Sequence, residues 1–151
     1  MKIYFAGPDV FYPGYGELTQ KIKDLCAPYN ITPLCPGMEK LNSPAAIFQR
    51  NLELIALADG LIANLNPFHG QEPDSGTVFE VGYGRGLGKW IIGYLADHRD
   101  LVTKLAPDAN FFLPDGTMVE DFGLPLNLML GLSADHLASS LAEAIKLAAS
   151  R

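Results

Sequence analysis

Short apolar runs alternate with longer helical patterns along most of this sequence, and this alternation constrains the fold more than any other feature. The runs lie at about residues 2–6, 31–34, 61–65 and 90–95, and Gly, Pro or Asp residues bound them, as expected for buried strands. Strands that alternate with helices form parallel sheets connected by right-handed crossovers. The sequence therefore predicts the α/β class, with a single doubly wound, mainly parallel sheet and helices on both faces, as in flavodoxin-like or Rossmann-like folds.

Helical patterns occupy the segments between these runs. An amphipathic pattern covers about residues 17–27, and Ser43-Pro44 is typical of an N-cap and first turn, here of a helix that extends to about residue 58. A third helix is predicted over about residues 77–87, and a last one from the N-cap Ser133 to about residue 149. Residues 97–123 carry only turn signals, with room for a short strand or hairpin.

Length and charge limit the class of protein. A chain of 151 residues fits one domain of ordinary size, so we expect a single domain over residues 1–151. The formal net charge of -6 disfavours nucleic acid polymers as partners, because binding them requires clustered basic residues. No apolar segment approaches the length of a membrane span, and the first residues do not resemble a signal peptide. These features predict a cytoplasmic protein that does not bind membranes.

Motifs of several other protein classes are missing. The sequence has no G-x-x-x-x-G-K-[ST] phosphate loop and no G-x-S-x-G nucleophile elbow. His69, His98 and His136 lack the spacing of metal ligands. Cys26 and Cys35 have no companions for a zinc site or a disulfide framework. We therefore expect no metal, no cofactor, and reduced cysteines with a structural role.

Two acidic residues follow the third predicted strand, at the edge of the sheet where such folds bind ligands. Glu80 would lie in the first turn of a helix that begins near Thr77, where free backbone N–H groups and the helix dipole favour the ionised carboxylate that a nucleophile requires. From its spacing alone, Glu80 fits a capping or dipole-complementing role at least as well as a catalytic one. Asp74 can act in a site or simply form an Asx-turn or N-cap before the helix.

Two polar residues on other elements are further candidates. Asn51 interrupts an apolar stripe of the second predicted helix that contains Ile47, Leu54 and Ile55. Its amide therefore needs a partner, either a backbone group or a ligand. Tyr4 lies near the end of the first strand, where its hydroxyl can reach a carboxylate on a neighbouring element or be satisfied within the core.

Four sequence blocks occur together, at residues 3–11, 63–68, 74–83 and 125–129. In their composition and order these blocks resemble nucleoside 2-deoxyribosyltransferases, and the resemblance extends over nearly the whole chain. It implies a glycosyltransferase that transfers 2-deoxyribose between purine and/or pyrimidine bases, with a role in nucleoside metabolism such as purine salvage. Deoxynucleosides and free nucleobases would be its partners.

The resemblance implies a retaining double displacement through a covalent deoxyribosyl-Glu80 intermediate. Glu80 would attack the anomeric carbon and release the first base, and Tyr4 would orient Glu80. Asn51 and Asp74 would lie near the base or the sugar, with Asp74 helping to manage the proton that the departing base acquires. A carboxylate nucleophile is chemically suited to this reaction, because two successive inversions at an oxocarbenium-like centre give net retention.

The resemblance also implies a homo-oligomer, either a dimer or a hexamer built as a trimer of dimers. Asn127 would reach the 5′-hydroxyl of a sugar bound in the neighbouring subunit, and Met129 would line the same pocket. Two positions bear on base preference: Asn51 stands where some members carry Asp, and His69 stands where Arg is expected.

Transfer to a second base requires that water be excluded from the glycosyl-enzyme, and an aromatic lining would promote this. Phe11, Tyr12 and Phe68 are the candidates for that lining. Two alternatives remain. A deoxynucleoside 5′-monophosphate N-glycosidase would use the same covalent step with water as acceptor. A noncatalytic nucleotide-binding domain would share the fold, with Glu80 as a helix-start residue.

Overall fold

A single sheet positions the elements that border the candidate site. In the computed structural model, which describes residues 1–151, five strands form one sheet in the order β2-β1-β3-β4-β5. The strands are β1 (Lys2–Ala6), β2 (Thr32–Leu34), β3 (Gly60–Asn64), β4 (Trp90–Tyr94) and β5 (His136–Ala138). Every pair is parallel, and the order is that of flavodoxin-like folds. The predicted doubly wound α/β fold is therefore confirmed.

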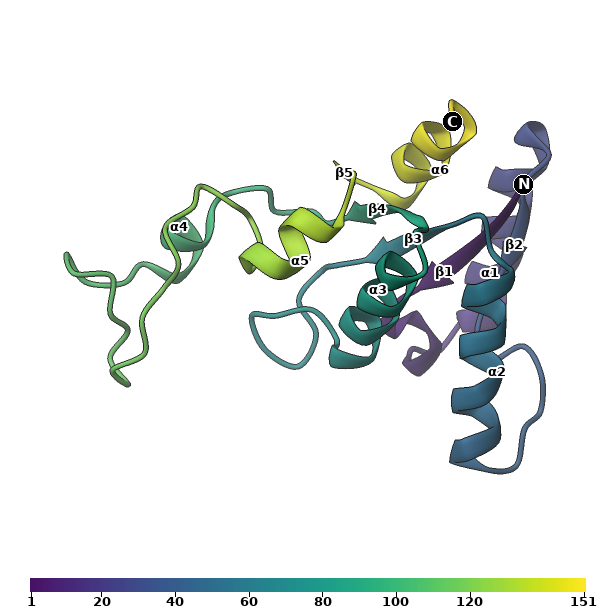
Figure 1. Ribbon diagram of the computed structural model, residues 1–151, viewed down its shortest axis with the longest axis horizontal. Coiled ribbons are helices and arrows are strands. Elements are labelled where there is room, and N and C mark those ends of the chain that lie inside the picture. Colours follow the sequence, from purple (N-terminus) through teal and green to yellow (C-terminus); the bar gives the residue numbers. More distant parts are fainter.

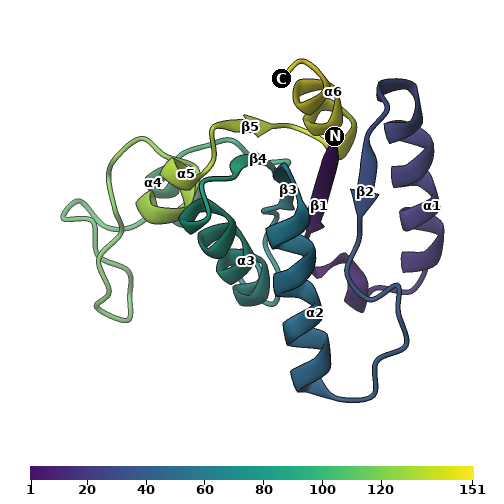
Figure 2. The same cartoon turned by 45° about the vertical axis from the view of Figure 1, so that its right-hand side comes forward.

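Helices cover both faces of this sheet (Figures 1 and 2). On one face pack α1 (Tyr15–Cys26) and α6 (Leu141–Ala149). On the other pack α2 (Pro44–Leu57), α3 (Ser75–Gly86) and α5 (Leu128–Ser133). The remaining helices are short and lie in connections: η1 (Pro8–Phe11), η2 (Ala27–Tyr29) and α4 (Leu101–Leu105). None of the helices combines the length and apolar character needed to cross a membrane.

Alternation along β1 decides which side chains reach which face. Ile3 and Phe5 belong to the apolar cluster under α1 and α6, whereas Tyr4 and Ala6 belong to the cluster under α2, α3 and α5. All four are buried, because both faces of a doubly wound sheet are covered by helices. The side chain of Tyr4 therefore lies on the same face as the helices that carry Asn51 and Glu80.

The C-terminal third differs from the prediction. Ser133 does not cap the last helix: it ends α5, β5 follows, and Ser140 caps α6 by accepting a hydrogen bond from the Glu143 N–H. Because β5 has only three residues, it is too short to show a period-two pattern, and the surrounding Ala and Leu residues read as one long helix.

The irregular segment before α5 contains one helix that the sequence pattern does not predict. Asp100 caps α4 by accepting from the Thr103 N–H at 2.8 Å, and at five residues α4 is too short for a periodic pattern. Beyond it, Phe112 and Met118 form an isolated antiparallel bridge, which fits the hairpin among the two alternatives of a short strand or a hairpin. Figure 1 shows this segment extending away from the sheet, on the side of α4 and α5.

Candidate active site

One cavity of about 810 Å³ opens at the carboxyl edge of the sheet. It lies between the loop after β1, the loop after β2, and the helices α2 and α3. Ligands of doubly wound proteins bind at this edge, and the volume is in the range of small-molecule sites. Four of the residues predicted from the sequence line it: Phe11, Asn51, Asp74 and Glu80.

Two side chains hold the carboxylate of Glu80. The Tyr4 hydroxyl donates to Oε1 of Glu80 at 2.7 Å, and Nδ2 of Asn51 donates to the same oxygen at 3.4 Å. The first bond is short and the second is at the long end of the accepted range. Oε2 of Glu80 receives no hydrogen bond from the chain. One oxygen is therefore anchored and the other remains available for chemistry.

The position of Glu80 in its helix corrects the sequence prediction. Because α3 begins at Ser75 with Asp74 as its N-cap, Glu80 lies in the second turn, beyond the free N–H groups of the first. The expected stabilisation of the anion by the helix start is therefore wrong. Burial instead raises the pKa of Glu80 to about 7, against the opposing hydrogen bond from Tyr4, with a further rise from the charge of Asp74 and a small opposing effect of Asn51.

Tyr4 acts as a donor at all ordinary pH values. Its side chain is fully buried, and burial together with the neighbouring Glu80 carboxylate raises the pKa of Tyr4 far above its usual value. A phenol that keeps its proton can only donate to a carboxylate. The sequence left open whether this hydroxyl meets a neighbouring carboxylate or a core partner, and the geometry selects the carboxylate.

Asp74 is an N-cap and also lies in the wall of the cavity. Its Oδ2 accepts from the Thr77 N–H at 2.8 Å and from the Thr77 hydroxyl at 2.9 Å, so it is the N-cap of α3. It also lines the cavity, and its Oδ1 accepts no hydrogen bond from the chain. Capping therefore fixes the carboxyl group and leaves one oxygen free.

The aromatic candidates form a stack at the rim of the cavity. Phe11 lines the cavity and is 69% exposed. Phe68 stacks on Phe11 with ring centroids 5.8 Å apart, and the Tyr12 ring meets Phe68 edge-on with its centroid 6.1 Å away. Tyr12 and Phe68 do not line the cavity themselves, and only Phe68 packs directly on Phe11. His69 extends the stack, 3.9 Å from Phe68.

Asn127 and Met129 are not brought to this cavity within one chain. Oδ1 of Asn127 accepts from the Met129 N–H at 3.0 Å, and Nδ2 donates to Glu120 at 2.5 Å, so Asn127 caps α5. Met129 is 72% exposed. Their expected role in a neighbouring subunit stays a prediction.

The loop after β2 is the part of the site that the sequence did not indicate. Residues 35–42 line the cavity, although no candidate residue was predicted from the sequence in this segment. The contribution of this loop could have been predicted, because β2 is also a parallel strand whose carboxyl end meets the same edge of the sheet. The thiol of Cys35 lies in this wall, and burial raises its pKa to about 11. No group of three or more potential metal ligands gathers in the chain.

Close packing within the chain explains one glycine of α3 and does not explain two others. A Cβ at Gly84 would lie 2.8 Å from a methyl carbon of Leu61, so close packing against β3 explains Gly84. Gly82 and Gly86 have nothing near the position of a Cβ, so no contact within the chain accounts for them.

The fold and the cavity define an α/β protein with a small-molecule site at the carboxyl edge of a doubly wound sheet and a buried carboxylate at its centre. The sequence model of the nucleoside 2-deoxyribosyltransferase family matches residues 3–129. The chain belongs to this family.

One solved structure supports this assignment, and other proteins resemble the chain in fold or in sequence. A 2-deoxyribosyltransferase from Leishmania mexicana has a TM-score of 0.89 and 36% identity, over 99% of this chain and 97% of that chain. A CMP N-glycosidase from Clostridium botulinum has a TM-score of 0.57 at 13% identity, over 100% of both chains, which is a likeness of fold alone. An uncharacterised protein of Schizosaccharomyces pombe is 32% identical over 108 residues, which are 64% of this chain and 51% of that protein. The chain thus spans about half the length of this relative.

Proposed function

We propose that this chain transfers 2-deoxyribose between nucleobases by a retaining double displacement, with Glu80 as the nucleophile. One observation carries the proposal: Glu80 is held in the cavity by hydrogen bonds to a single oxygen, Oε1, from Tyr4 and Asn51. This arrangement leaves Oε2 free to attack. Family membership and the likeness to the Leishmania enzyme support the choice of deoxynucleosides and nucleobases as substrates.

The proposed steps balance in atoms and charge. A lone pair of Oε2 of Glu80 forms a bond to the anomeric carbon, and the bond from that carbon to the base breaks with its electron pair on the base nitrogen. The base acquires a proton through Asp74, whose Oδ1 is free of hydrogen bonds within the chain. A nitrogen of the incoming base then forms a bond to the anomeric carbon on the face opposite Glu80, and the bond from Oε2 to that carbon breaks with its electron pair returning to the carboxylate. The incoming base loses its proton by the same route. Two inversions give net retention.

Incubation with a donor in the presence and absence of an acceptor tests this reaction. Thymidine or deoxyinosine is incubated with the pure protein, with and without adenine, and the products are separated by chromatography. We expect deoxyadenosine only when adenine is present. Free base without a new nucleoside would indicate hydrolysis, and no reaction with either donor would support a noncatalytic nucleotide-binding domain.

The hydrolase alternative has one specific observation in its favour. Lys23 and Lys40 line the cavity, and neither takes part in an ion pair. Cations of this kind can bind the 5′-phosphate of a deoxynucleotide. Comparison of deoxycytidine with its 5′-monophosphate separates the two functions: a transferase acts on the nucleoside, whereas the alternative predicts base release from the monophosphate alone.

The raised pKa of Glu80 should determine how turnover depends on pH. Because only the ionised carboxylate is a nucleophile and burial raises its pKa to about 7, kcat/KM should rise with pH along a limb centred near that value. An ordinary glutamate would give a limb near pH ~4.3. The measurement is kcat/KM for one donor across a pH range that spans both values. A profile that is already flat well below neutrality would contradict the assignment of Glu80 or its burial.

We propose further that two copies of the chain complete each site. The helices on the Glu80 face of the sheet carry exposed apolar side chains: Phe48 on α2 is 53% exposed, Phe79 on α3 is 50% exposed, and Met129 on α5 is the most exposed of the three. Exposed apolar patches on one face are typical of interaction surfaces. An isologous contact uses the same patch on both copies. Such a contact would bring α5 of the partner, with Asn127 and Met129, toward the cavity.

A charge in this surface should disrupt the assembly. We expect Phe48→Asp to convert the oligomer to monomers in sedimentation velocity experiments, because a carboxylate would be buried without a partner. Turnover per chain should fall in proportion to the monomer fraction. Tyr29→Asp is the control, since Tyr29 is comparably exposed but follows α1, beyond the opposite face. Monomeric wild-type protein at micromolar concentration, or an intact Phe48→Asp oligomer, would contradict the proposal.

A further inference from the structure

Two sequence blocks contain polar residues that the reaction does not use. Asp9 lies in η1, after β1, and Asn64 and Asn66 lie at the end of β3 and just after it. None of the three lines the large cavity. All three are partly buried, and hydrogen bonds connect them into one network.

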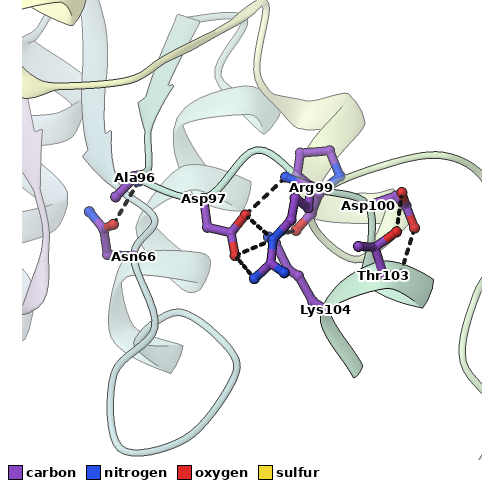
Figure 3. A network of polar contacts seen from close by, with 8 residues as sticks. Asn66, Ala96, Asp97, Arg99, Asp100, Thr103 and Lys104 are labelled. Carbon is purple, nitrogen blue, oxygen red and sulfur yellow. Dashed lines mark hydrogen bonds and ion pairs between the residues drawn. The ribbon is translucent and has the colours of Figure 1, made fainter. Parts of the chain in front are cut away.

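The network runs across the carboxyl ends of three strands. Nδ2 of Asn64 donates to both oxygens of Asp9, at 3.2 and 3.0 Å. Oδ1 of Asn64 accepts from Nδ2 of Asn66 at 2.7 Å and from its backbone N–H at 3.2 Å. Oδ1 of Asn66 in turn accepts from the Ala96 N–H, after β4, at 2.9 Å (Figure 3). Each amide therefore has its orientation determined by its partners, and we call these residues the Asp9 ladder.

Gly7 shows how closely the ladder is packed. A Cβ at Gly7 would overlap the carboxylate of Asp9 and lie 2.9 Å from Cβ of Asn64. The backbone of Gly7 is extended, with φ of 166°, so any residue could adopt its conformation. Glycine is therefore required here for space, because the Asp9 carboxylate folds back over the end of β1.

The ladder bears on the cavity through the residues that follow Asp9. Val10 and Phe11 line the cavity, and both are exposed, so apart from the stacking of Phe11 on Phe68 little burial holds these two residues in place. Val10 also packs against the loop after β2, since a Cβ at Gly37 would lie 2.9 Å from Val10 Cγ2. A segment with so little burial opens readily unless hydrogen bonds fix it.

We propose that Asp9 is a positioning residue, which acts through Asn64 and Asn66 to hold Phe11 as a wall of the substrate cavity. The negative charge of Asp9 strengthens its bonds to the Asn64 amide, because hydrogen bonds to ionised groups are roughly twice as strong as neutral ones. The wall is thus tied directly to the ends of β3 and β4. The role of this wall in binding substrate rests on the proposed function. The effect of the ladder on the rigidity of residues 8–14, the segment that contains Phe11, does not depend on it.

Exchange of the two partners tests the ladder. Asp9→Asn leaves a neutral and weaker pair, and Asn64→Asp sets two carboxylates against each other. In the double variant, the new amide at position 9 can donate to the new carboxylate at position 64, which still accepts from Asn66, so the ladder is restored with the same net charge. We expect KM for the donor to rise about tenfold in Asn64→Asp and less in Asp9→Asn, with kcat changed less than about threefold, and to return to within about twofold of wild type in the double variant.

Hydrogen–deuterium exchange of residues 8–14 provides a readout that does not require activity. Exchange should accelerate in each single variant and return to the wild-type rate in the double variant. Asp24→Asn is the control for lost charge, because Asp24 is an exposed residue on the surface of α1. If Asn64→Asp does not fold, Asp9→Asn and the double variant still make the comparison.

The outcomes separate the two proposals. Exchange that does not change in the single variants, or effects that add in the double variant, would overturn the ladder even in an active enzyme. Inactive wild-type protein with the expected exchange pattern would refute the proposed function and leave the ladder standing. A raised KM that the double variant restores would support both.

Discussion

Glu80→Gln should abolish transfer while making the fold more stable at neutral pH. Without a nucleophilic carboxylate the covalent step is lost, so we expect kcat to fall roughly 10⁴- to 10⁶-fold, as for other enzymes that lose a nucleophile. The amide oxygen that the substitution leaves in place of Oε1 can still accept from Tyr4 and Asn51, so the geometry of the site should persist. The measurement is turnover of deoxyinosine with adenine as acceptor.

The gain in stability follows from the direction of the pKa shift. Burial raises the folded pKa of Glu80 from 4.5 to about 7, so the protonated form is the one that folding favours. Its contribution to stability is fully present below the unfolded pKa and is lost as pH rises through the folded one. Above neutrality the glutamine variant should therefore be more stable than wild type by about 3 kcal/mol, and below the unfolded pKa the difference should nearly vanish.

Denaturant unfolding at pH ~8 and pH ~4 measures this difference. Glu53→Gln is the matched control, because Glu53 is an exposed residue of α2 and should change the free energy of unfolding by less than about 0.5 kcal/mol. An inactive Glu80→Gln variant that is less stable than wild type at the higher pH would mean that lost activity reflects lost structure. That result would remove the support for Glu80 as a nucleophile.

Tyr4→Phe should lower kcat/KM about 10- to 100-fold at neutral pH, because a hydrogen bond to a charged group contributes about 1.5–3 kcal/mol. It should also move the acid limb of the pH profile to higher pH, since the Tyr4 hydrogen bond lowers the pKa of Glu80. A purely structural role for the hydroxyl would not move that limb. Both effects are read from one profile of kcat/KM against pH.

Tyr94→Phe is the control for this variant. Tyr94 is a partly buried tyrosine at the end of a central strand, which packs against the opposite apolar cluster and forms no hydrogen bond to Glu80. Its loss should leave the limb in place. If Tyr4→Phe gives the same limb as wild type, Tyr4 does not tune the nucleophile, and the short contact at 2.7 Å has only a packing role.

The strands and the main helices could be predicted from sequence because their signals are local. The position of Tyr4 near the end of β1 left open whether its hydroxyl meets a carboxylate or a core partner, and only the family resemblance paired it with Glu80. The turn of α3 that carries Glu80 was wrong, because Asp74, Ser75 and Thr77 are all capping residue types and only tertiary packing selects among them. The expectation that the helix start ionises the Glu80 carboxylate depended on this turn, so it was wrong as well.

Other features depend on contacts between distant segments and leave no local pattern. The pairing of Asp9 with Asn64 joins residues that are far apart in sequence, and neither residue is distinctive by itself. The three residues of β5 form a strand because β4 offers an open edge, which no sequence period reveals. Asn127 and Met129 would act in a site of a partner chain, and contacts between chains leave no local pattern either. Their roles therefore stay predictions.

Trapping the intermediate tests the central claim most directly. The protein is mixed with excess deoxyinosine without acceptor base, quenched in acid within seconds, and digested for peptide mass spectrometry. We predict a mass increase of one deoxyribosyl group on the peptide that contains Glu80, located to that residue by fragmentation, which disappears when adenine is added before the quench. Turnover without any adduct, or an adduct on another residue, would contradict Glu80 as the nucleophile.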